Sequence, residues 1–227
     1  MEKRIIIAID GFSSCGKSTL AKAMAKALEY VFVDTGAMYR AIALYFLRND
    51  IAFNDDIAIQ NALEDIELRF KFNALSQKSD MYLNGEHVEL LIREMQVSSK
   101  VSEVAAIEAV RDFAVAQQQA MGQQKGIVMD GRDIGTVVFP EAELKIFMTS
   151  SPETRAKRRF EELQAKGDSV SYDEVLQNVQ ERDYIDTHRA DSPLVKAEDA
   201  VEIDNSHLTR EEQFTLVSEL VQEIITA

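Results

Sequence analysis

The chain has 227 residues, of which 46% are hydrophobic and 28% charged, values typical of one soluble globular domain with room for small insertions. Its 25 Lys and Arg against 39 Asp and Glu give a net charge of −14, which argues against polymeric nucleic acid or an anionic membrane as the main partner. A single cysteine cannot form an internal disulfide, so the composition predicts a cytoplasmic protein in a reducing compartment.

The first apolar run of the chain is too short to be a signal peptide or a membrane span. Residues 5–9 are apolar and follow a basic start, but Asp10 ends the run. Both kinds of segment need a longer apolar stretch. The sequence therefore predicts no membrane anchor.

Short apolar runs alternate with helical patterns along the chain. The alternation predicts an α/β fold in which a five-stranded parallel sheet carries helices on both faces. Buried strands are expected over 5–9, 30–36, 126–133, 142–150 and 198–205. Helices are expected over 18–28, 38–49, 94–121, 152–167, 170–190 and 208–227.

The stretch 67–93 has a different pattern. Apolar and polar residues alternate in ELRFKFN and in DMYLNGEHVEL, and Asn84-Gly85 is typical of a tight hairpin turn. We therefore expect a small antiparallel insertion of two or three strands at this place.

Residues 11–19 read GFSSCGKST and come directly after the first predicted strand. Gly11, Gly16, Lys17 and Ser18 match the phosphate-binding loop pattern, in which glycines let successive backbone N–H groups face an oxyanion. The helix that begins near Lys17 adds its positive end to the same point. Lys17 can then reach the β- and γ-phosphates, and the Ser18 hydroxyl can bind Mg²⁺.

This loop predicts that the protein binds a nucleoside triphosphate, but it does not distinguish among the reactions that use one. GTPases, motor ATPases, small-molecule kinases and ATP-sensing modules share such loops. The absence of an N-K-x-D motif weakens the GTPase interpretation, and the absence of a long coupling domain weakens the motor interpretation. A kinase needs a second substrate site, and the carboxyl ends of parallel strands are where ligands bind in such sheets.

Two motifs at predicted strand ends could form that second site. DTGAMYR (34–40) comes after the second strand, although Asp and Thr also cap helices and Arg40 could be solvated. DGRDIGT (130–136) comes at the end of the strand GIVMD, and Asp130 is placed to act near Mg²⁺. Taken alone, DGRD could equally be a surface turn.

A third group is cationic. Arg155, Lys157, Arg158 and Arg159 stand within five residues, and three of them can line one side of a helix. Such a cluster is often a solvated face, but phosphoryl transfer needs cations to neutralise the migrating group.

Five stretches together, in order and spacing, resemble the bacterial cytidylate kinases, a family of nucleoside monophosphate kinases with the P-loop kinase fold. They are GFSSCGKST, DTGAMYRA, DGRDIGTVVFP, KIFMTSSPETRAKRR and ERDYIDTHRADSPL. The resemblance runs over essentially the whole chain. The stretch 67–93 resembles the enlarged acceptor domain of the family's long form.

The resemblance implies a role for each matching residue. It implies that ATP is bound by the loop residues Gly11, Phe12, Ser13, Ser14, Cys15, Gly16, Lys17, Ser18 and Thr19. It also implies that Ser18 and Asp130 lie near the metal. For CMP it implies that Arg40, Arg132 and Arg182 hold the phosphate, that Thr35, Asp133 and Arg189 read cytosine, and that Asp186 binds the ribose, with Tyr39, Ser102 and Arg111 as further contacts. It implies that Lys17 and Arg132 take part in phosphoryl transfer, together with Arg155, Arg158 and Arg159, which would belong to a lid over ATP.

Three positions depart from the family pattern. Thr35 stands where many relatives have serine, and the hydroxyl is kept. Phe12 replaces a common proline, and Ser18 replaces a common glycine. The last change should strengthen direct binding of the metal.

These observations predict ATP- and Mg²⁺-dependent phosphorylation of CMP and dCMP by in-line transfer, in one kinase domain that acts as a monomer. The predicted core is 1–66, 94–150 and 191–227, with the acceptor insertion at 67–93 and the lid and acceptor arm at 151–190. A kinase for UMP or dTMP and a non-catalytic ATP-binding module remain alternatives. Cys15 is interpreted as a small loop residue, with thiol sensitivity as a second hypothesis because a helix start lowers a thiol pKa.

Overall fold

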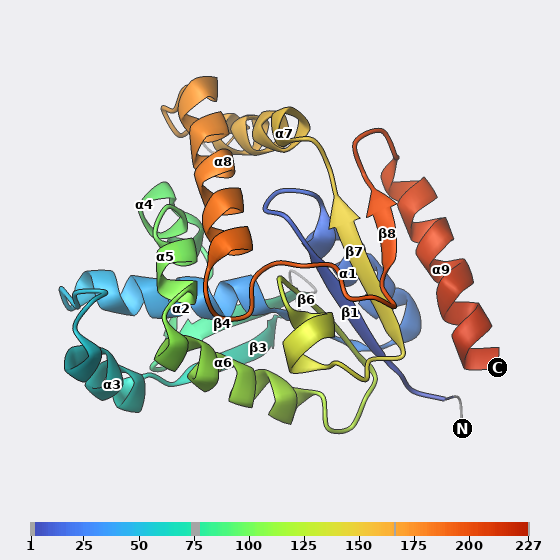
Figure 1. The fold of residues 1–227 in the computed structure, drawn as a ribbon, viewed down its shortest axis with the longest axis horizontal. Coiled ribbons are helices and arrows are strands. Elements are labelled where there is room, and N and C mark those ends of the chain that lie inside the picture. Colours follow the sequence, from blue (N-terminus) through green and yellow to red (C-terminus); the bar gives the residue numbers. More distant parts are fainter. Residues whose placement is uncertain (1–2, 74–77, 166, 227) are drawn as a thin grey trace. The chain divides into compact units, whose positions relative to one another are not determined.

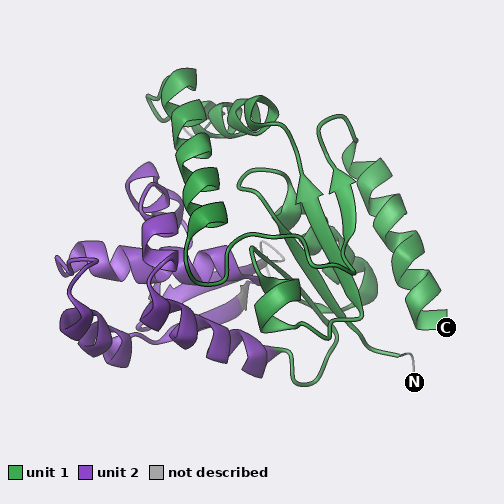
Figure 2. Ribbon diagram, in the orientation of Figure 1, with its two compact units in different colours: residues 1–32, 122–227 green, residues 33–121 purple. Residues whose placement is uncertain are grey.

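The computed structural model describes residues 3–73, 78–165 and 167–226. The chain divides into two compact units, residues 1–32 with 122–227 as unit 1 and residues 33–121 as unit 2 (Figure 2). Each unit has its own hydrophobic core. Among the described residues, no helix combines the length and the hydropathy that a membrane span requires.

A five-stranded parallel sheet has the strand order β2-β6-β1-β7-β8 (Figure 1). Its central strand β1 pairs in parallel with β6 and β7, and β7 pairs in parallel with β8. Because the strands are parallel, their carboxyl ends lie at one edge of the sheet. The bounds are β1 Ile6–Gly11, β2 Val31–Asp34, β6 Ile127–Gly131, β7 Leu144–Thr149 and β8 Val201–Asp204.

Two helices cover one face of this sheet in unit 1. Helix α1, Lys17–Leu28, comes after β1, and helix α9, Arg210–Thr226, packs against it. Alternate residues of the first apolar run (Ile5, Ile7 and Ile9) join the core beneath these helices. Ile6 and Ala8, which point to the other face, are buried as well, so β1 is covered on both faces and has no polar residue before Asp10.

A helical pair occupies residues 152–188 of unit 1. Helix α7, Pro152–Ala165, packs against α8, Tyr172–His188 (Figure 1). Ser171 and Glu174 form a reciprocal capping box at the start of α8, which satisfies two backbone donors of the first turn. Gly167 in the connection has a φ of +86°, a conformation that glycine adopts without strain.

Unit 2 is built around helix α2, Thr35–Arg48, which has a strongly apolar surface. The helix begins three residues earlier than predicted because the Asp34 side chain accepts a hydrogen bond from the Ala37 N–H at 2.9 Å. The other helical segments are α3 Asp56–Asp65, the 3₁₀ turn η1 Leu91–Arg93, α4 Met95–Ser98, α5 Val101–Ala105 and α6 Glu108–Met121.

The predicted small antiparallel sheet is also in unit 2. Strands β3 Leu68–Asn73, β4 Lys78–Leu83 and β5 Glu86–His87 pair in the order β3-β4-β5. Asn84 and Gly85 both have positive φ, 49° and 81°, as expected for a two-residue hairpin turn. The predicted insertion is confirmed, although its residues 74–77 lie outside the described residues.

Two predictions of helices needed correction. The helical prediction over 94–121 needs refinement: the described chain forms three helices there, α4, α5 and α6. Val97, Val101 and Val104 share one helical phase, whereas Val110 and Ala114 have another, so a continuous helix could not bury all five. Helix α3 was not predicted; Asp55 caps it by accepting from the Ala58 N–H at 3.0 Å. Positions 166 and 227, near the ends of two predicted helices, lie outside the described residues.

Candidate active site

The phosphate loop connects β1 to α1 at the carboxyl edge of the sheet. Gly11 has a φ of 142°, and a Cβ there would lie 2.0 Å from the Met148 carbonyl oxygen of β7. Only glycine permits this approach of loop and strand. The loop is therefore held against the sheet at its first residue.

Lys17 and Cys15 are both buried in the loop. The Lys17 Nζ donates to the Phe12 carbonyl at 2.6 Å and lies 3.7 Å from the Cys15 Sγ. Burial is the largest cause that lowers the pKa of Lys17, and the nearby charge of Arg132 lowers it further. Cys15 is 0% exposed and packs within the core of unit 1, which supports its interpretation as a small packing residue.

Ser18 and Asp130 meet across the loop. The Ser18 hydroxyl donates to the Asp130 Oδ2 at 2.6 Å, which brings the predicted metal-binding pair together. A hydroxyl and a carboxylate are hard oxygen donors of the kind that Mg²⁺ prefers. Within the described ranges no group of three or more His, Cys, Asp or Glu side chains is arranged to hold a metal.

The DGRDIGT motif lies at the end of β6 and turns into a short π-helix, Ile134–Val138. The Arg132 Nε donates to the Asp186 Oδ2 of α8 at 2.7 Å. Burial raises the pKa of Asp186, but the charges of Arg132, Arg182 and Arg189 outweigh it and hold that pKa below its usual value. Asp186 is therefore ionised at neutral pH and orients Arg132.

A second ion pair lies beside the first. Asp133 and Arg189 are both buried, with the Arg189 Nη2 4.0 Å from the Asp133 Oδ1. The Arg189 guanidinium also donates to the Ser192 carbonyl at 2.8 Å through Nε. The structure thus groups Arg132, Asp133, Arg182, Asp186 and Arg189 within unit 1.

The cations of α7 have different surroundings. Arg155 is 2% exposed and forms two hydrogen bonds with Asp183 of α8. Arg158 donates to the Asn205 carbonyl at 2.8 Å, and Arg159 pairs with Glu162 at 3.0 Å. For the Arg158 Nη1, which is buried, no hydrogen-bond acceptor occurs in the described part of the chain.

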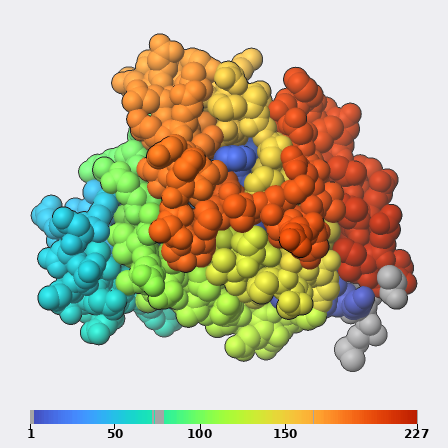
Figure 3. Space-filling view, in the orientation of Figure 1, coloured from blue at the N-terminus to red at the C-terminus, as the bar shows by residue number. Residues whose placement is uncertain are grey.

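A hollow in the surface of unit 1 exposes the phosphate loop (Figure 3). The loop after β1, coloured blue, lies at the bottom of this hollow. Helices α7 and α8 form one side, and the segment that leads into α9 forms the other. The hollow therefore combines the loop with the helical pair that carries the arginines.

The remaining predicted residues lie in unit 2. Thr35, Tyr39 and Arg40 are on the first turns of α2, and Arg40 donates to both oxygens of Asp34, at 3.2 and 3.1 Å. Ser102 lies on α5 and Arg111 on α6, and both helices contact α2. Arg111 is 1% exposed and donates to the Ala105 carbonyl at 3.3 Å.

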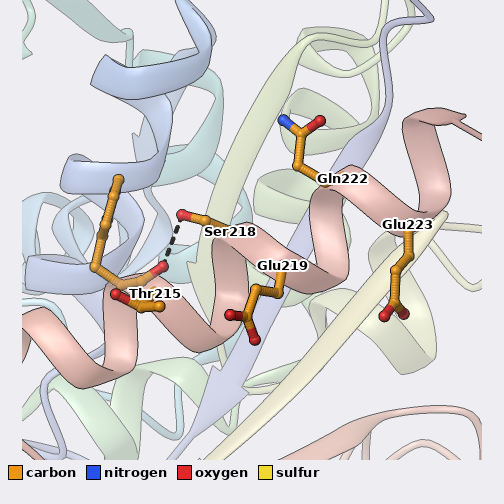
Figure 4. Close-up of a pocket in the computed structure, with 6 residues that line it drawn as sticks. Thr215, Ser218, Glu219, Gln222 and Glu223 are labelled. Atoms are coloured by element: carbon orange, nitrogen blue, oxygen red, sulfur yellow. Dashed lines mark hydrogen bonds between the residues drawn. The ribbon is translucent and has the colours of Figure 1, made fainter.

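A shallow pocket elsewhere in unit 1 has a different character. Its labelled side chains all project from α9, and Ser218 donates to the Phe214 carbonyl at 2.7 Å (Figure 4). The lining contains two glutamates and no cation, so it does not suit a phosphate. The lining residues are Phe214, Thr215, Ser218, Glu219, Gln222 and Glu223.

Several residues that support the site were not predicted. Asp183 binds Arg155, and Asn205 donates to the Cys15 carbonyl at 2.5 Å. Arg93 reaches Asp34 from 59 residues away along the chain, at 2.9 Å. For Asp183 the ERD motif was a usable signal; for Asn205 and Arg93 the contact depends on distant pairing that no local pattern reveals.

The comparisons with known proteins agree with one another. A profile of the family described as cytidylate kinase matches residues 7–224. A protein named cytidylate kinase from Flavobacterium johnsoniae is 63% identical over 227 residues, which cover 98% of each chain. Its counterpart from Bacteroides thetaiotaomicron is 56% identical over 98% of this chain and 99% of its own.

Solved structures with low sequence identity share the fold alone. A shikimate kinase from Bacteroides thetaiotaomicron superposes with a TM-score of 0.50 at 13% identity, covering 97% of this chain and 99% of its own. An uncharacterised protein from Eubacterium ventriosum has the same TM-score at 11% identity, covering 99% and 100%. On the family profile and the full-length relatives, this chain belongs to the cytidylate kinase family.

Proposed function

We propose that this protein transfers the γ-phosphoryl group of ATP to the 5′-phosphate of CMP and dCMP, giving CDP and dCDP. The observation that carries the proposal is the full-length similarity to proteins named cytidylate kinase, at 63% identity over 98% of the chain. The P-loop kinase fold and the grouping of arginines beside the phosphate loop support it.

The phosphate loop, residues 11–19, would hold the triphosphate. Its backbone N–H groups and the start of α1 provide the positive environment that phosphate oxygens require. Lys17, which donates to the Phe12 carbonyl in the structure, would exchange that bond for the β- and γ-phosphates. Gly11, Phe12, Ser13, Ser14, Cys15, Gly16, Ser18 and Thr19 complete the proposed ATP site.

Ser18 and Asp130 would hold Mg²⁺, Asp130 directly or through water. The 2.6 Å contact of their oxygens places two suitable donors together. When bound, the metal supplies positive charge to the phosphates during transfer. The chain's own contribution is to orient those two oxygens.

Charged and polar side chains would hold the acceptor. In unit 1, Arg132 and Arg182 would bind the CMP phosphate, Asp186 the ribose, and Asp133 with Arg189 the cytosine. An Asp–Arg pair offers an acceptor and donors to a pyrimidine edge. In unit 2, Arg40 would add a phosphate contact, Thr35 a base contact, and Tyr39, Ser102 and Arg111 further contacts.

Arg155, Arg158 and Arg159 would neutralise the migrating phosphoryl group from α7. The buried Arg158 Nη1, with no acceptor among the described residues, is ready for a phosphate oxygen. Because the acceptor phosphate is already ionised, positioning and charge neutralisation would supply most of the rate. Closure of the lid would exclude water and suppress ATP hydrolysis.

We further propose a functional division into a core (1–66, 94–150 and 191–227), an acceptor insertion (67–93) and a lid with acceptor arm (151–190). The separate antiparallel sheet and the α7–α8 pair support the last two parts. We also propose a cytoplasmic monomer; sedimentation of the purified protein would test its oligomeric state.

A direct assay across acceptors tests the proposed function. Purified protein is incubated with Mg·ATP and CMP, dCMP, UMP or dTMP, and the diphosphate is quantified by chromatography. We expect CMP and dCMP to give the highest kcat/KM. A value for UMP equal to that for CMP would refute the cytosine assignment, and ATP binding without any transfer would favour the non-catalytic alternative.

A further inference from the structure

Asp10 is a buried carboxylate to which the proposed reaction assigns no role. It is the residue of β1 just before the phosphate loop, and it is 5% exposed. In the sheet its Cα pairs with that of Gly131, the residue that precedes Arg132. Asp10 therefore lies beside the start of the turn that carries Arg132 and Asp133.

Both oxygens of Asp10 bind that turn. The Ile134 N–H donates to Oδ1 and the Gly135 N–H donates to Oδ2, each at 2.8 Å. These two N–H groups are the first backbone donors of the π-helix. The first donors of a helix have no acceptor within the helix itself. Asp10 thus caps a helical turn 124 residues away in the chain.

Because Asp10 caps the π-helix, Asp133 does not have to do so, although aspartate is a common capping residue. Asp133 is the N-cap residue of the π-helix, and an aspartate at that position usually accepts from the first helical N–H groups. Here Asp133 makes no side-chain cap bond, and its carboxylate lies 4.0 Å from Arg189 instead. Because Asp10 supplies the cap, the Asp133 side chain can face Arg189.

Gly135 fits the same arrangement. A Cβ at this position would lie 3.4 Å from the Asp10 Oδ2 and 3.1 Å from the Lys145 Cδ. The added atom would press on the stem of Lys145, whereas its contact with the carboxylate would be an ordinary one. Glycine therefore leaves room for the lysine stem beside the turn that binds Asp10.

Burial of Asp10 disfavours its ionised form, and the hydrogen bonds from the turn compensate only in part. Desolvation raises the pKa of Asp10 to about 7, while the bonds from Gly135 and Ile134 and the charge of Lys17 lower it. The nearby Asp133 raises it further. A buried carboxylate stabilises the fold less than a well-packed apolar side chain would. The contacts of Asp10 therefore indicate a role in fixing the geometry of the turn.

We propose that Asp10 is a positioning residue for acceptor selection: by capping the turn after Asp133, it directs the Asp133 carboxylate toward Arg189 and the pyrimidine. The inference rests on the proposed cytidylate kinase activity. Asp10 itself touches neither substrate.

The test is Asp10→Asn, assayed at about pH 8, where Asp10 with its pKa of about 7 is mostly ionised. The change keeps the size of the side chain but turns one acceptor into a donor facing an N–H group. We expect kcat/KM for CMP relative to UMP to fall about 3- to 10-fold, the range of one hydrogen bond. The change should come mainly from the KM of CMP, with a smaller change in the KM of ATP. Val217→Ala, a core truncation in α9, is the matched control and should lower stability without changing the CMP/UMP ratio.

A double-mutant cycle with Asp133→Ala separates positioning from general damage. If Asp10 acts through Asp133, Asp10→Asn should leave the CMP/UMP ratio of the Asp133→Ala protein unchanged. An equal loss for CMP and UMP, or the same fall in the Asp133→Ala background, would overturn the proposal.

Asp10→Ser provides a second approach if Asp10→Asn does not fold. Its shorter side chain offers one oxygen in place of two, so it should lower the same ratio; an unchanged ratio would overturn the proposal. The two hypotheses fail differently. A wild-type protein without CMP preference refutes the proposed function and this inference together, whereas a CMP-selective wild type with an unchanged Asp10→Asn ratio refutes the inference alone.

Discussion

Arg155 of α7 and Asp183 of α8 form a paired ion bridge, with the Nη1 2.8 Å from Oδ1 and the Nη2 2.6 Å from Oδ2. The same guanidinium donates to the carbonyls of Ser150 at 2.9 Å and Ser13 at 3.3 Å. It also lies 5.0 Å from the ring centroid of Phe12, within cation–π range. One arginine thus ties the helical pair to the phosphate loop.

Loss of Asp183 should therefore destabilise the protein. Asp183→Ala leaves a buried guanidinium without its carboxylate, a change that costs about 3–5 kcal/mol in other proteins. We expect that range in the free energy of unfolding by urea, and a smaller loss for Asp183→Asn. Glu202→Gln is the control, because Glu202 and Lys196 form an exposed pair worth less than about 1 kcal/mol. Equal effects of Asp183→Ala and Glu202→Gln would contradict the bridge.

Arg132→Ala should impair transfer strongly. The proposed phosphate contact would lose its charge, and the buried Asp186 would lose its partner at 2.7 Å. Removal of one donor from a developing charge typically costs about 100- to 1,000-fold, and we expect kcat/KM for CMP to fall by that factor. Arg132→Lys, which keeps the charge but not the fork, should recover part of it. An unchanged rate for the alanine variant would remove Arg132 from the site.

Asp133→Ala should affect choice of acceptor more than turnover. The pair with Arg189 at 4.0 Å would lose the acceptor that we propose for the cytosine edge. We expect the kcat/KM ratio of CMP to UMP to fall while kcat with saturating CMP changes less. The acceptor assay measures both. Parallel losses for the two nucleotides would count against base recognition by Asp133.

The buried Asp10 makes stability depend on pH. Because burial raises the pKa of Asp10 to about 7, the folded protein keeps a proton between about pH 4 and pH 7 that the unfolded chain releases. The stability that this group contributes is fully present below about pH 4 and is lost as pH rises through about 7. The neighbouring Asp133 and Lys17 are unchanged in Asp10→Asn, which therefore isolates the effect.

We expect the unfolding free energy of the wild type, minus that of Asp10→Asn, to decrease from about pH 4 to about pH 8. The decrease is at most about 4 kcal/mol, at about 1.36 kcal/mol per pKa unit. Urea titrations at several pH values measure it. A difference that stays constant or grows with pH would refute this titration.

Cys15 should react slowly in the folded protein. Its side chain is wholly buried in the core of unit 1, although its loop position suggested thiol sensitivity. We expect alkylation by N-ethylmaleimide to be much slower in buffer than in urea, with activity retained during exposure in buffer. Rapid inactivation that ATP slows would instead support the thiol-sensitive hypothesis.

Local patterns were sufficient for most of the fold. The β-branched residues 5–9 predicted β1, Asn84-Gly85 predicted the β4–β5 turn, and both are confirmed. The division of 94–121 into three helices was missed because it depends on a change of phase among valines that share a core with α2. Helix α3 was missed although Asp55 carried a capping signal.

The sequence by itself determined the family, the phosphate loop and the candidate residues, because these depend on residue types at fixed spacings. Only the tertiary structure decided which groups hold them in place. Asp10 with Gly135, Arg155 with Asp183 and Asn205 with Cys15 are pairs separated by 28 to 190 residues in the chain. Their contacts arise where strand ends and helices meet, and burial then sets both the strength of these bonds and the pKa of Asp10.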